Sequence, residues 1–213
     1  MRFDRVIWDF NGTILDDVDT GIESADELLS RHGLPQMRTR EKYLSLFGFP
    51  IIDYYRRLGF DFEKIPFSVL ANEWVEIYLE KVKNAPVREG IRDVISAFRS
   101  AGLKQTVLSM TESSMLDYQL GLLGVKELFD EVCGLDDIYA KSKLSLAVKW
   151  KEEHSEECAV FVGDTTHDAE SADIIGAECI LLSGGHEARE KLCGTGAFVA
   201  DSPDGVLKYV LGI

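Results

Sequence analysis

The sequence FDRVIWDFNGT spans residues 3–13, and the sequence CAVFVGDTTHD spans residues 158–168. Each contains a short run of large apolar and β-branched residues that ends in an acid and a turn, which is typical of a buried strand. Weaker runs of the same kind occur elsewhere in the chain, and segments with helical periodicity separate them. This alternation predicts βαβ units, which build a doubly wound parallel sheet with helices on both faces. We therefore predict an α/β fold.

The remaining elements follow the same rhythm, apart from one helical stretch. Strands are predicted at residues 105–109, 131–134, 178–182 and 197–199, and helices at residues 16–33, 91–101, 113–123, 142–154, 168–175, 187–192 and 203–211. Residues 39–83 keep a helical pattern that is broken at residues 48–50, at Gly59 and at Pro66, and they show no strand-like alternation. We predict a core domain made of residues 1–16 and 86–213, with a small all-helical cap domain inserted at residues 17–85. Because ligands of open parallel sheets bind at the carboxyl ends of the strands, such an insert would cover the site as a lid.

The composition describes a globular chain with an acidic balance. Its 213 residues include 46% apolar and 28% charged side chains, and 37 acids against 23 bases give a net charge of −14. The apolar fraction excludes intrinsic disorder, and the negative charge argues against nucleic acid and an anionic membrane as partners. An anionic small substrate would need local cations to hold it against this field.

Targeting signals and disulfides are not expected. Residues 1–10 contain acids and no apolar segment typical of a signal peptide, and no apolar run approaches the ~18 residues that a spanning helix needs. The cysteines show no CxxC pair and no zinc-ligand spacing; they are Cys133, Cys158, Cys179 and Cys193. We predict reduced thiols in the core of a cytoplasmic protein.

Chemically active side chains lie at the predicted strand ends. They are Asp9, Ser109, Asp164, Asp168 and one of the lysines Lys141 and Lys143. We expect them to converge, because the carboxyl ends of parallel strands meet at one edge of the sheet. Carboxylates are ligands that Mg²⁺ prefers, and a carboxylate can also attack phosphorus, while the ammonium and hydroxyl groups hold phosphoryl oxygens. This set predicts a phosphoryl-transfer site.

Four motifs in order resemble those of the haloacid dehalogenase (HAD) superfamily. Residues 9–13, DFNGT, match the first motif, and Ser109 matches the second. A lysine within residues 140–143, AKSK, matches the third, and residues 163–168, GDTTHD, match the fourth. The helical segment that contains DYYRRLG at residues 53–59 resembles the phosphoglycolate phosphatase-like branch. The resemblance covers essentially the whole chain and implies a Rossmann-like core with a helical cap.

The resemblance implies a magnesium site built from the first and fourth motifs. Asp9 would be the catalytic nucleophile and a magnesium ligand, and Asn11 would offer its backbone carbonyl to the ion. Asp164 and Asp168 would complete or anchor the coordination of the Mg²⁺ cofactor.

The resemblance also implies residues that hold the phosphoryl group. Ser109 and the following Met110 would bind the substrate, with Ser109 donating a hydrogen bond to the phosphoryl oxygens. The third-motif lysine would bind both the phosphoryl group and the nucleophile carboxylate. Lys141 and Lys143 both compete for this role, and the sequence Ala-x-Ser-Lys at the start of a helix favours Lys143.

Asn11 departs from the family pattern. Phosphatases that resemble this chain usually carry a second aspartate at this position, which protonates the leaving oxygen and later deprotonates water. An amide cannot exchange a proton near neutral pH, so an acid–base contribution of ~100- to 10,000-fold is missing or comes from another group. Three interpretations follow: a leaving group that needs little protonation, such as an acyl or aryl phosphate; a substitute acid; or a protein that binds a phosphorylated ligand and turns it over slowly. The substitutes nearest in sequence are Asp16, Asp17, His167 and His186.

We predict a magnesium-dependent phosphatase that hydrolyses a small phosphorylated metabolite, a phosphomonoester, through an aspartyl-phosphate. One alternative is a catalytically weakened phosphate-ligand-binding or regulatory protein. Another is a phosphonate hydrolase or phosphomutase variant. A phosphonatase needs a cap lysine that forms a Schiff base, and the candidates are Lys42, Lys64, Lys81 and Lys83. Dehalogenation is disfavoured, because the fourth-motif acids suit magnesium, which that chemistry does not use.

Other side chains receive structural expectations. Trp74 is expected in the core. His186, which follows two glycines, is expected to close a loop, and the alternative is that it reaches the cleft. Tyr54 and Tyr55 follow the break at residues 48–50, and one of them is a candidate for a place facing the site. The oligomeric state is left open.

Overall fold

The computed structural model describes residues 2–135 and 143–213. Within these ranges six strands form one parallel sheet in the order β3-β2-β1-β4-β5-β6. The strands are β1 (Arg5–Trp8), β2 (Lys104–Glu112), β3 (Glu131–Leu135), β4 (Ala159–Gly163), β5 (Glu178–Leu182) and β6 (Phe198–Ala200). The prediction of a doubly wound parallel α/β fold is confirmed.

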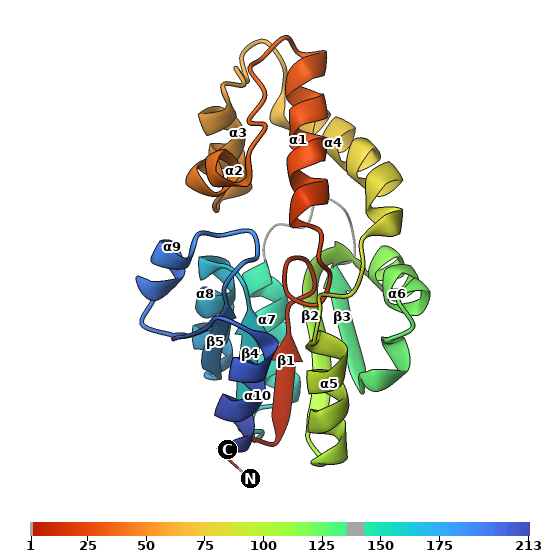
Figure 1. Cartoon of the computed structure of the whole chain (residues 1–213), viewed down its shortest axis with the longest axis vertical. Helices are drawn as coiled ribbons and strands as arrows, with labels where there is room; N and C mark the ends of the chain where they lie inside the picture. The colour runs from red at the N-terminus through yellow and green to blue at the C-terminus, as the bar shows by residue number, and fades with distance from the viewer. Residues whose placement is uncertain (1, 136–142) are drawn as a thin grey trace.

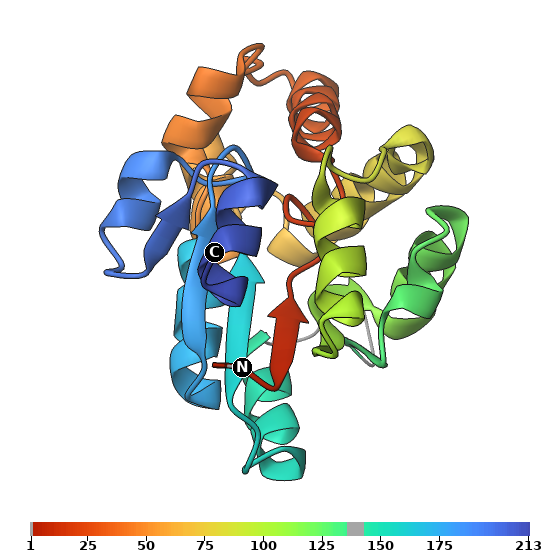
Figure 2. The ribbon, with the colours of Figure 1, turned by 60° about the horizontal axis from the view of Figure 1, so that its bottom comes forward.

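Helices cover both faces of the sheet (Figure 1; Figure 2). One face carries α5 (Ile91–Ser100), α6 (Ser113–Leu122) and α10 (Pro203–Leu211), and the other carries α7 (Lys143–Glu153) and α8 (Thr166–Ile175). A short helix, α9 (Arg189–Cys193), packs beside β6, and a 3-10 turn at Lys126–Leu128 precedes β3. Among the described residues, none of the helices is both long enough and apolar enough to cross a bilayer.

The central strands explain why the sequence contains near-continuous apolar runs. Every residue of β1 and β4 is buried, because helices cover the sheet on both sides. Successive side chains of β1 alternate between the two faces, as the strand period of two requires. Val6 and Trp8 belong to the hydrophobic cluster under α5 and α10, and Ile7 belongs to the cluster under α7 and α8. β2 and β3 lie on one side of β1, and β4, β5 and β6 lie on the other. The strand order therefore changes direction between β1 and β4, and these two strands flank the switch point of the sheet.

Between β1 and β2, where every residue is described, the chain forms a separate helical layer beyond the carboxyl ends of the strands (Figure 1). This layer contains α1 (Val18–Arg31), α2 (Arg40–Leu46), α3 (Ile51–Leu58) and α4 (Phe67–Lys81), followed by a 3-10 turn at Val82–Asn84. Its apolar side chains form a hydrophobic cluster of their own, in which Leu28 and Leu70 are fully buried. The breaks fall where the pattern indicated, since α3 ends at Gly59 and α4 follows Pro66. We refer to residues 17–85 as the helical insert.

The second strand is longer than predicted. The prediction ended it at Ser109, but β2 continues to Glu112, which pairs with Leu135 of β3 after a register shift. Gly134 permits this close approach, because a Cβ at this position would lie 2.7 Å from the Cα of Ser113. Ser109 therefore lies inside a strand rather than at its end.

All four cysteines are free thiols, as predicted, but their expected place in the core is wrong. Cys158 and Cys193 are exposed, and Cys133 and Cys179 are half-buried. The two exposed thiols lie where elements begin or end, since Cys158 precedes β4 and Cys193 ends α9. An apolar neighbourhood in the sequence does not bury a residue at such a position.

Candidate active site

Three buried acids meet at the switch point of the sheet. Asp9 follows β1, Asp164 follows β4, and Asp168 lies in the first turn of α8. Each offers a carboxylate oxygen, and the three oxygens lie within 4.8 Å of one another. The predicted convergence of these acids at one edge of the sheet is thus observed, because β1 and β4 are parallel neighbours.

The local sequence of the β4–α8 junction fixes Asp168. Its Oδ2 accepts hydrogen bonds from the backbone N–H groups of Asp164 (3.0 Å) and Thr165 (2.9 Å) and from Thr165 Oγ1 (2.7 Å). Thr165 and Asp168 thereby form the capping box of α8. Gly163 makes room for this arrangement, because a Cβ there would lie 2.3 Å from the Asp168 Cγ.

Asp164 is held by groups from two other segments. Its Oδ1 accepts a hydrogen bond from Thr13 Oγ1 (3.1 Å), and its Oδ2 accepts one from the backbone N–H of His186 (2.6 Å). Gly12, with φ of +74°, passes so close that a Cβ would lie 2.2 Å from Asp164 Oδ2. Burial raises the pKa of Asp164 to about 6, against the lowering effect of nearby His186.

Lys143 supplies the positive charge in this cluster. It is the first residue of α7, it is buried, and its Nζ forms ion pairs with Asp9 and Asp168. Burial would lower the pKa of Lys143, but these two carboxylates raise it, so the side chain remains an ammonium. Lys141, the competing lysine, lies outside the described residues.

The charge balance of the cluster fits a divalent cation. Three carboxylates and one ammonium leave two uncompensated negative charges in a buried site, and burial together with Asp168 and Asp164 raises the pKa of Asp9 well above its ordinary value. Carboxylate oxygens are the ligands that Mg²⁺ prefers, and a bound cation would offset the repulsion that raises this pKa. The donor set therefore suits magnesium.

Comparison with known proteins identifies the family. The family described as haloacid dehalogenase-like hydrolase matches residues 6–182. The chain belongs to this family. It is 24% identical over 204 residues to a phosphoglycolate phosphatase from Synechococcus elongatus. The aligned region covers 95% of this chain and 92% of that protein. The predictions of the family and of a hydrolase with phosphatase-like relatives are thus confirmed.

Two further relatives span most of this haloacid dehalogenase-like hydrolase. One is a protein from Caldanaerobacter subterraneus that is named provisionally as a pyrophosphatase. It is 25% identical over 187 residues, and the aligned region covers 85% of this chain and 82% of that protein. The solved structure of a haloacid dehalogenase-like hydrolase from Streptococcus pneumoniae has a TM-score of 0.83 at 20% identity and covers 98% of this chain and 99% of that chain. This likeness shows the shared fold.

The two residues expected to bind substrate line the same cavity as Asp9. Ser109 is buried, and its Oγ accepts a hydrogen bond from the backbone N–H of Thr111 (3.1 Å) and lies 3.2 Å from Thr111 Oγ1. Met110 is the next residue along β2. The structure therefore brings Ser109 and Met110 to the cluster, although Ser109 does not end its strand.

Asn11 in this hydrolase is engaged on both sides of its amide. Its Nδ2 donates hydrogen bonds to Asp17 Oδ2 (2.9 Å) and Tyr78 Oη (2.8 Å), and its Oδ1 accepts one from Thr111 Oγ1 (3.0 Å). Tyr78 also donates to Asp17 Oδ2 at 2.5 Å. Asn11 thus joins the end of β1 to β2 and to two helices of the insert.

His186 lies in the loop between β5 and α9 and lines the site cavity, so it takes the place at the cleft that was the alternative to a loop-closing role alone. It is buried, its Nδ1 lies 2.7 Å from Tyr43 Oη, and its Nε2 lies 3.2 Å from Asp17 Oδ1. Burial alone would lower the pKa of His186, but Asp17 and Asp164 raise it to about 9. Burial would raise the pKa of Asp17, but His186 and its other hydrogen-bond donors bring it below the ordinary value.

A sequence signal for His186 does exist, because it lies in the loop that follows β5, at the same end of the sheet as Asp9. Gly185 lets this loop reach Asp164, since a Cβ at that position would lie 2.1 Å from Asp164 Oδ2. Asp16 and His167 are two other residues that could supply the proton that Asn11 cannot, and Asp16 is exposed. His167 lines the cavity, where its ring stacks on Phe49 with centroids 4.6 Å apart.

The acid cluster opens into a cavity of about 360 Å³, which we call the site cavity. Its opposite wall comes from α2, α3 and α4 of the helical insert and the loop after α2. Both Tyr54 and Tyr55 line it, so the expectation that one of them faces the site is met by both. Trp74 also lines it and packs against two hydrophobic clusters, so its expected place in a core is only partly correct.

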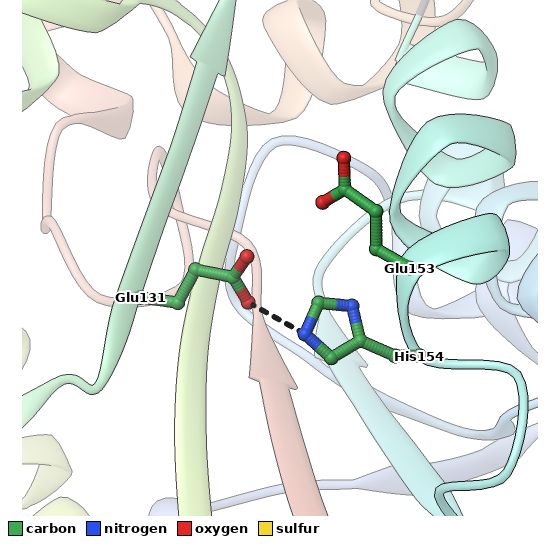
Figure 3. A group of neighbouring side chains, drawn as sticks. All are labelled: Glu131, Glu153 and His154. Atoms are coloured by element: carbon green, nitrogen blue, oxygen red, sulfur yellow. Dashed lines mark ion pairs between the residues drawn. The ribbon is translucent and has the colours of Figure 1, made fainter.

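A second group of candidate metal ligands lies at the opposite, amino end of the sheet (Figure 3). Glu131 begins β3, and Glu153 and His154 lie at the end of α7. Glu131 Oε2 accepts hydrogen bonds from Thr106 Oγ1 (3.1 Å) and Trp150 Nε1 (3.0 Å) and lies 3.5 Å from His154 Nε2. The His154 ring stacks on Trp150 with centroids 4.3 Å apart. These contacts pack β3 against the end of α7, and this structural role explains why these side chains lie together.

Proposed function

We propose that the protein is a magnesium-dependent phosphatase that hydrolyses a small phosphomonoester through an aspartyl-phosphate. The observation that carries this proposal is the buried cluster of Asp9, Asp164 and Asp168 with Lys143 at its centre. The names of its relatives, a phosphoglycolate phosphatase and a provisional pyrophosphatase, support hydrolysis of a phosphate bond. We also propose that residues 17–85 act as a cap domain over a core of residues 1–16 and 86–213.

The metal ligands would be Asp9, Asp164, the backbone carbonyl of Asn11 and, directly or as an anchor, Asp168. Bound there, Mg²⁺ would supply positive charge that neutralises the phosphoryl oxygens. Asp168 already uses Oδ2 for three hydrogen bonds within its capping box, which keeps its other oxygen turned toward Lys143.

The reaction would proceed in two displacements at phosphorus. A carboxylate oxygen of Asp9 attacks phosphorus, the bond to the leaving oxygen breaks, and that oxygen departs with the bonding electron pair and gains a proton. Water then attacks the same phosphorus, the bond to Asp9 breaks, and inorganic phosphate and the free carboxylate form. Lys143 and Ser109 would hold phosphoryl oxygens in both steps.

Asn11 favours a second candidate function, that of a phosphate-ligand-binding or regulatory protein with slow turnover. Its amide is held by Asp17, Tyr78 and Thr111 and offers no exchangeable acid proton. The phosphonatase alternative has less support. In the helical insert, which the structure describes in full, none of Lys42, Lys64, Lys81 and Lys83 lines the site cavity.

Release of phosphate from p-nitrophenyl phosphate by the full chain with Mg²⁺ tests the proposal. We expect Asp9→Asn to lower kcat by ~1,000-fold or more, because it removes the nucleophile. Asp16→Asn is the matched control, since Asp16 is an exposed acid outside the site cavity. The proposal is wrong if a broad panel of phosphate compounds yields no phosphate while calorimetry shows that Mg²⁺ binds.

A further inference from the structure

We infer that the substrate is an aryl phosphate whose organic group is aromatic and carries no second charge. This inference rests on the proposed function and goes beyond it by assigning the chemical class of the leaving group. Three independent observations support it: the side chains of the insert wall, the charges around the site cavity, and the amide at position 11.

The insert wall of the site cavity is made largely of aromatic rings. They are Tyr43, Phe47, Phe49, Tyr54, Tyr55, Trp74 and Tyr78. Their neighbouring rings contact one another, with centroid distances of 5.1 Å for Tyr43 and Phe47 and 5.2 Å for Phe47 and Tyr54. A cavity of ~150 Å³ lined by apolar groups is enough to bind benzene, so about 360 Å³ holds a ring together with a phosphoryl group. Aromatic walls favour an aromatic ligand, because offset and edge-to-face ring contacts stabilise it beyond simple burial.

The charges around the site cavity disfavour a second anionic group on the substrate. Its acidic lining residues are Asp9, Asp17, Glu112, Asp164 and Asp168. Among the described lining residues the cations are Lys143, paired with Asp9 and Asp168, and His186, paired with Asp17; no arginine is present. A carboxylate or second phosphate on the organic group would therefore be buried without a cation to pair with.

The basic side chains near the insert do not supply that cation. Arg57 donates hydrogen bonds to the carbonyl oxygens of Leu46 (2.6 Å) and Gly48 (3.0 Å), and Lys191 donates one to the carbonyl of Phe47. Neither lines the site cavity. These cations stabilise the loop after α2 and leave the aromatic wall uncharged.

The amide of Asn11 favours the same class of substrate, because it cannot protonate a leaving group. A phenol has a pKa of ~10, whereas water and simple alcohols lie near 16, so a phenolate leaves phosphorus without prior protonation far more readily than an alkoxide. In the first displacement, the bond from phosphorus to the aryl oxygen breaks, and the phenolate departs with the electron pair and takes a proton from solvent. An aryl ester thus avoids the step for which Asn11 has no proton.

Gln119 adds a preference for a hydrogen-bond donor on the ring. It lies on α6, lines the site cavity and a smaller neighbouring cavity, and is 8% exposed. Its Oε1 has no hydrogen-bond partner among the residues that the structure describes. Because an unpaired buried acceptor is unfavourable, a hydroxyl or N–H group on the ligand would be stabilised there.

Calorimetry with Mg²⁺ and two non-hydrolysable phosphonates tests the inference without turnover. Phenylphosphonate carries a neutral ring, and phosphonoacetate carries a second acid. We expect phenylphosphonate to bind ~10-fold more tightly. Equal affinity, tighter binding of phosphonoacetate, or binding of neither compound overturns the inference.

A pair of matched variants ties the preference to the aromatic wall. Phe49→Leu is expected to weaken phenylphosphonate ~2- to 10-fold and leave phosphonoacetate unchanged, since it removes one ring contact. Phe62→Leu changes an aromatic residue of the insert that lies outside the site cavity, and we expect both affinities to stay as in the native chain. The ratio of the two affinities within each variant controls for partial unfolding. A Phe49→Leu variant that weakens both ligands equally contradicts the assignment.

The failure of the inference can be distinguished from the failure of the proposed function. If phosphate is released from 2-phosphoglycolate faster than from phenyl phosphate, the inference is wrong and the phosphatase proposal stands. If phenylphosphonate binds more tightly but no phosphate ester is hydrolysed, the ligand class is supported and the phosphatase proposal is wrong.

Discussion

The side-chain nitrogen of Asn11 lies 2.9 Å from Oδ2 of Asp17, the N-cap residue of α1. This contact ties the first motif to the base of the helical insert, and Tyr78 of α4 joins it by hydrogen bonds to both residues. The side chain at position 11 therefore connects the proposed reaction centre to the helical insert. A change at this position should affect both catalysis and stability.

Asn11→Asp is expected to raise the turnover of glycerol phosphate by ~10-fold or more and to raise that of p-nitrophenyl phosphate much less. A carboxylic acid there can protonate a poor leaving group, whereas the aryl ester does not depend on protonation. The added carboxylate would face Asp17, so we expect the free energy of unfolding to fall by ~1–3 kcal/mol. Steady-state kinetics and urea denaturation measure the two effects.

Asn11→Ala is the matched control for that experiment, because it removes the same hydrogen bonds without adding an acid. It should lose stability and gain no activity on either ester. An equal gain for both esters in Asn11→Asp, or a gain in Asn11→Ala, would contradict the view that the missing proton donor belongs at this position. No gain on glycerol phosphate, with substantial native activity, would point instead to a substitute acid.

Lys143→Met is expected to destabilise the protein and to reduce its activity. The change removes the only cation paired with the buried carboxylates of Asp9 and Asp168 among the described residues, which should lower the free energy of unfolding by ~3–5 kcal/mol in the absence of Mg²⁺. We expect kcat to fall by ~100-fold or more, because a charged donor to the transferred group is lost. Urea denaturation and phosphate release measure both quantities.

Two lysines provide the controls for Lys143. Lys149→Met changes an exposed lysine of the same helix and should leave stability and kcat within error of the native values. Lys141→Met tests the competing third-motif lysine directly. If Lys141→Met abolishes activity and Lys143→Met does not, the assignment of Lys143 is wrong.

The convergence of the acids could be predicted from the sequence because it depends on one general rule. Parallel strands place their carboxyl ends at one edge of the sheet, so residues 9 and 164 come together once both runs are assigned as strands. The same rule missed the length of β2, since the register shift before Glu112 depends on pairing with β3. Strand ends in sequence are therefore less reliable than strand centres, where apolar side chains define the element.

The contacts of His186 could not be predicted in the same way. Its partners Tyr43 and Asp17 lie 143 and 169 positions away in the chain, and Tyr43 belongs to the helical insert. Such contacts depend on how the insert packs on the core, which no local pattern encodes. Only the position of His186 after a strand and two glycines gave a local signal.

Mg²⁺ is expected to stabilise the native chain against urea. At a concentration ~100 times its Kd, a ligand that binds only the folded state adds ~2.7 kcal/mol to the free energy of unfolding. Asp164→Asn should remove most of this increase, because it removes a carboxylate from the buried cluster. Denaturation curves with Mg²⁺ and with EDTA measure the difference for each variant.

Glu153→Gln is the matched control for the magnesium experiment, since it alters the second group of candidate ligands at the other end of the sheet. It should keep the full stabilisation by Mg²⁺. If Glu153→Gln loses that stabilisation and Asp164→Asn retains it, the ion binds at the amino end of the sheet and the proposed site is wrong.

The last prediction concerns stability and pH at the start of β1. Arg5 is buried, and its Nε and Nη2 donate to the Glu157 carboxylate at 2.5 and 3.2 Å, while Lys104 donates to the same carboxylate at 2.9 Å. The hydrogen bond from Arg5 is the main reason that the pKa of Glu157 falls to about 2, although burial acts in the opposite direction. A carboxylate with a depressed pKa stabilises the folded state above its unfolded pKa of ~4.5 and loses this effect as the pH falls toward 2.

Glu157→Gln should therefore lower the free energy of unfolding by ~1–2 kcal/mol at pH 7, a value reduced for the partial exposure of the carboxylate. The difference in the free energy of unfolding between this variant and the unsubstituted chain should shrink as the pH is lowered from 5 toward 3. In this range Glu157 becomes protonated in the unfolded chain, so its ion pair with Arg5 stabilises the folded state less. Glu156→Gln, which changes an exposed neighbour, should show no such dependence. Urea denaturation at several pH values measures the difference, and a constant difference across this range would mean that Glu157 acts through packing rather than through its charge.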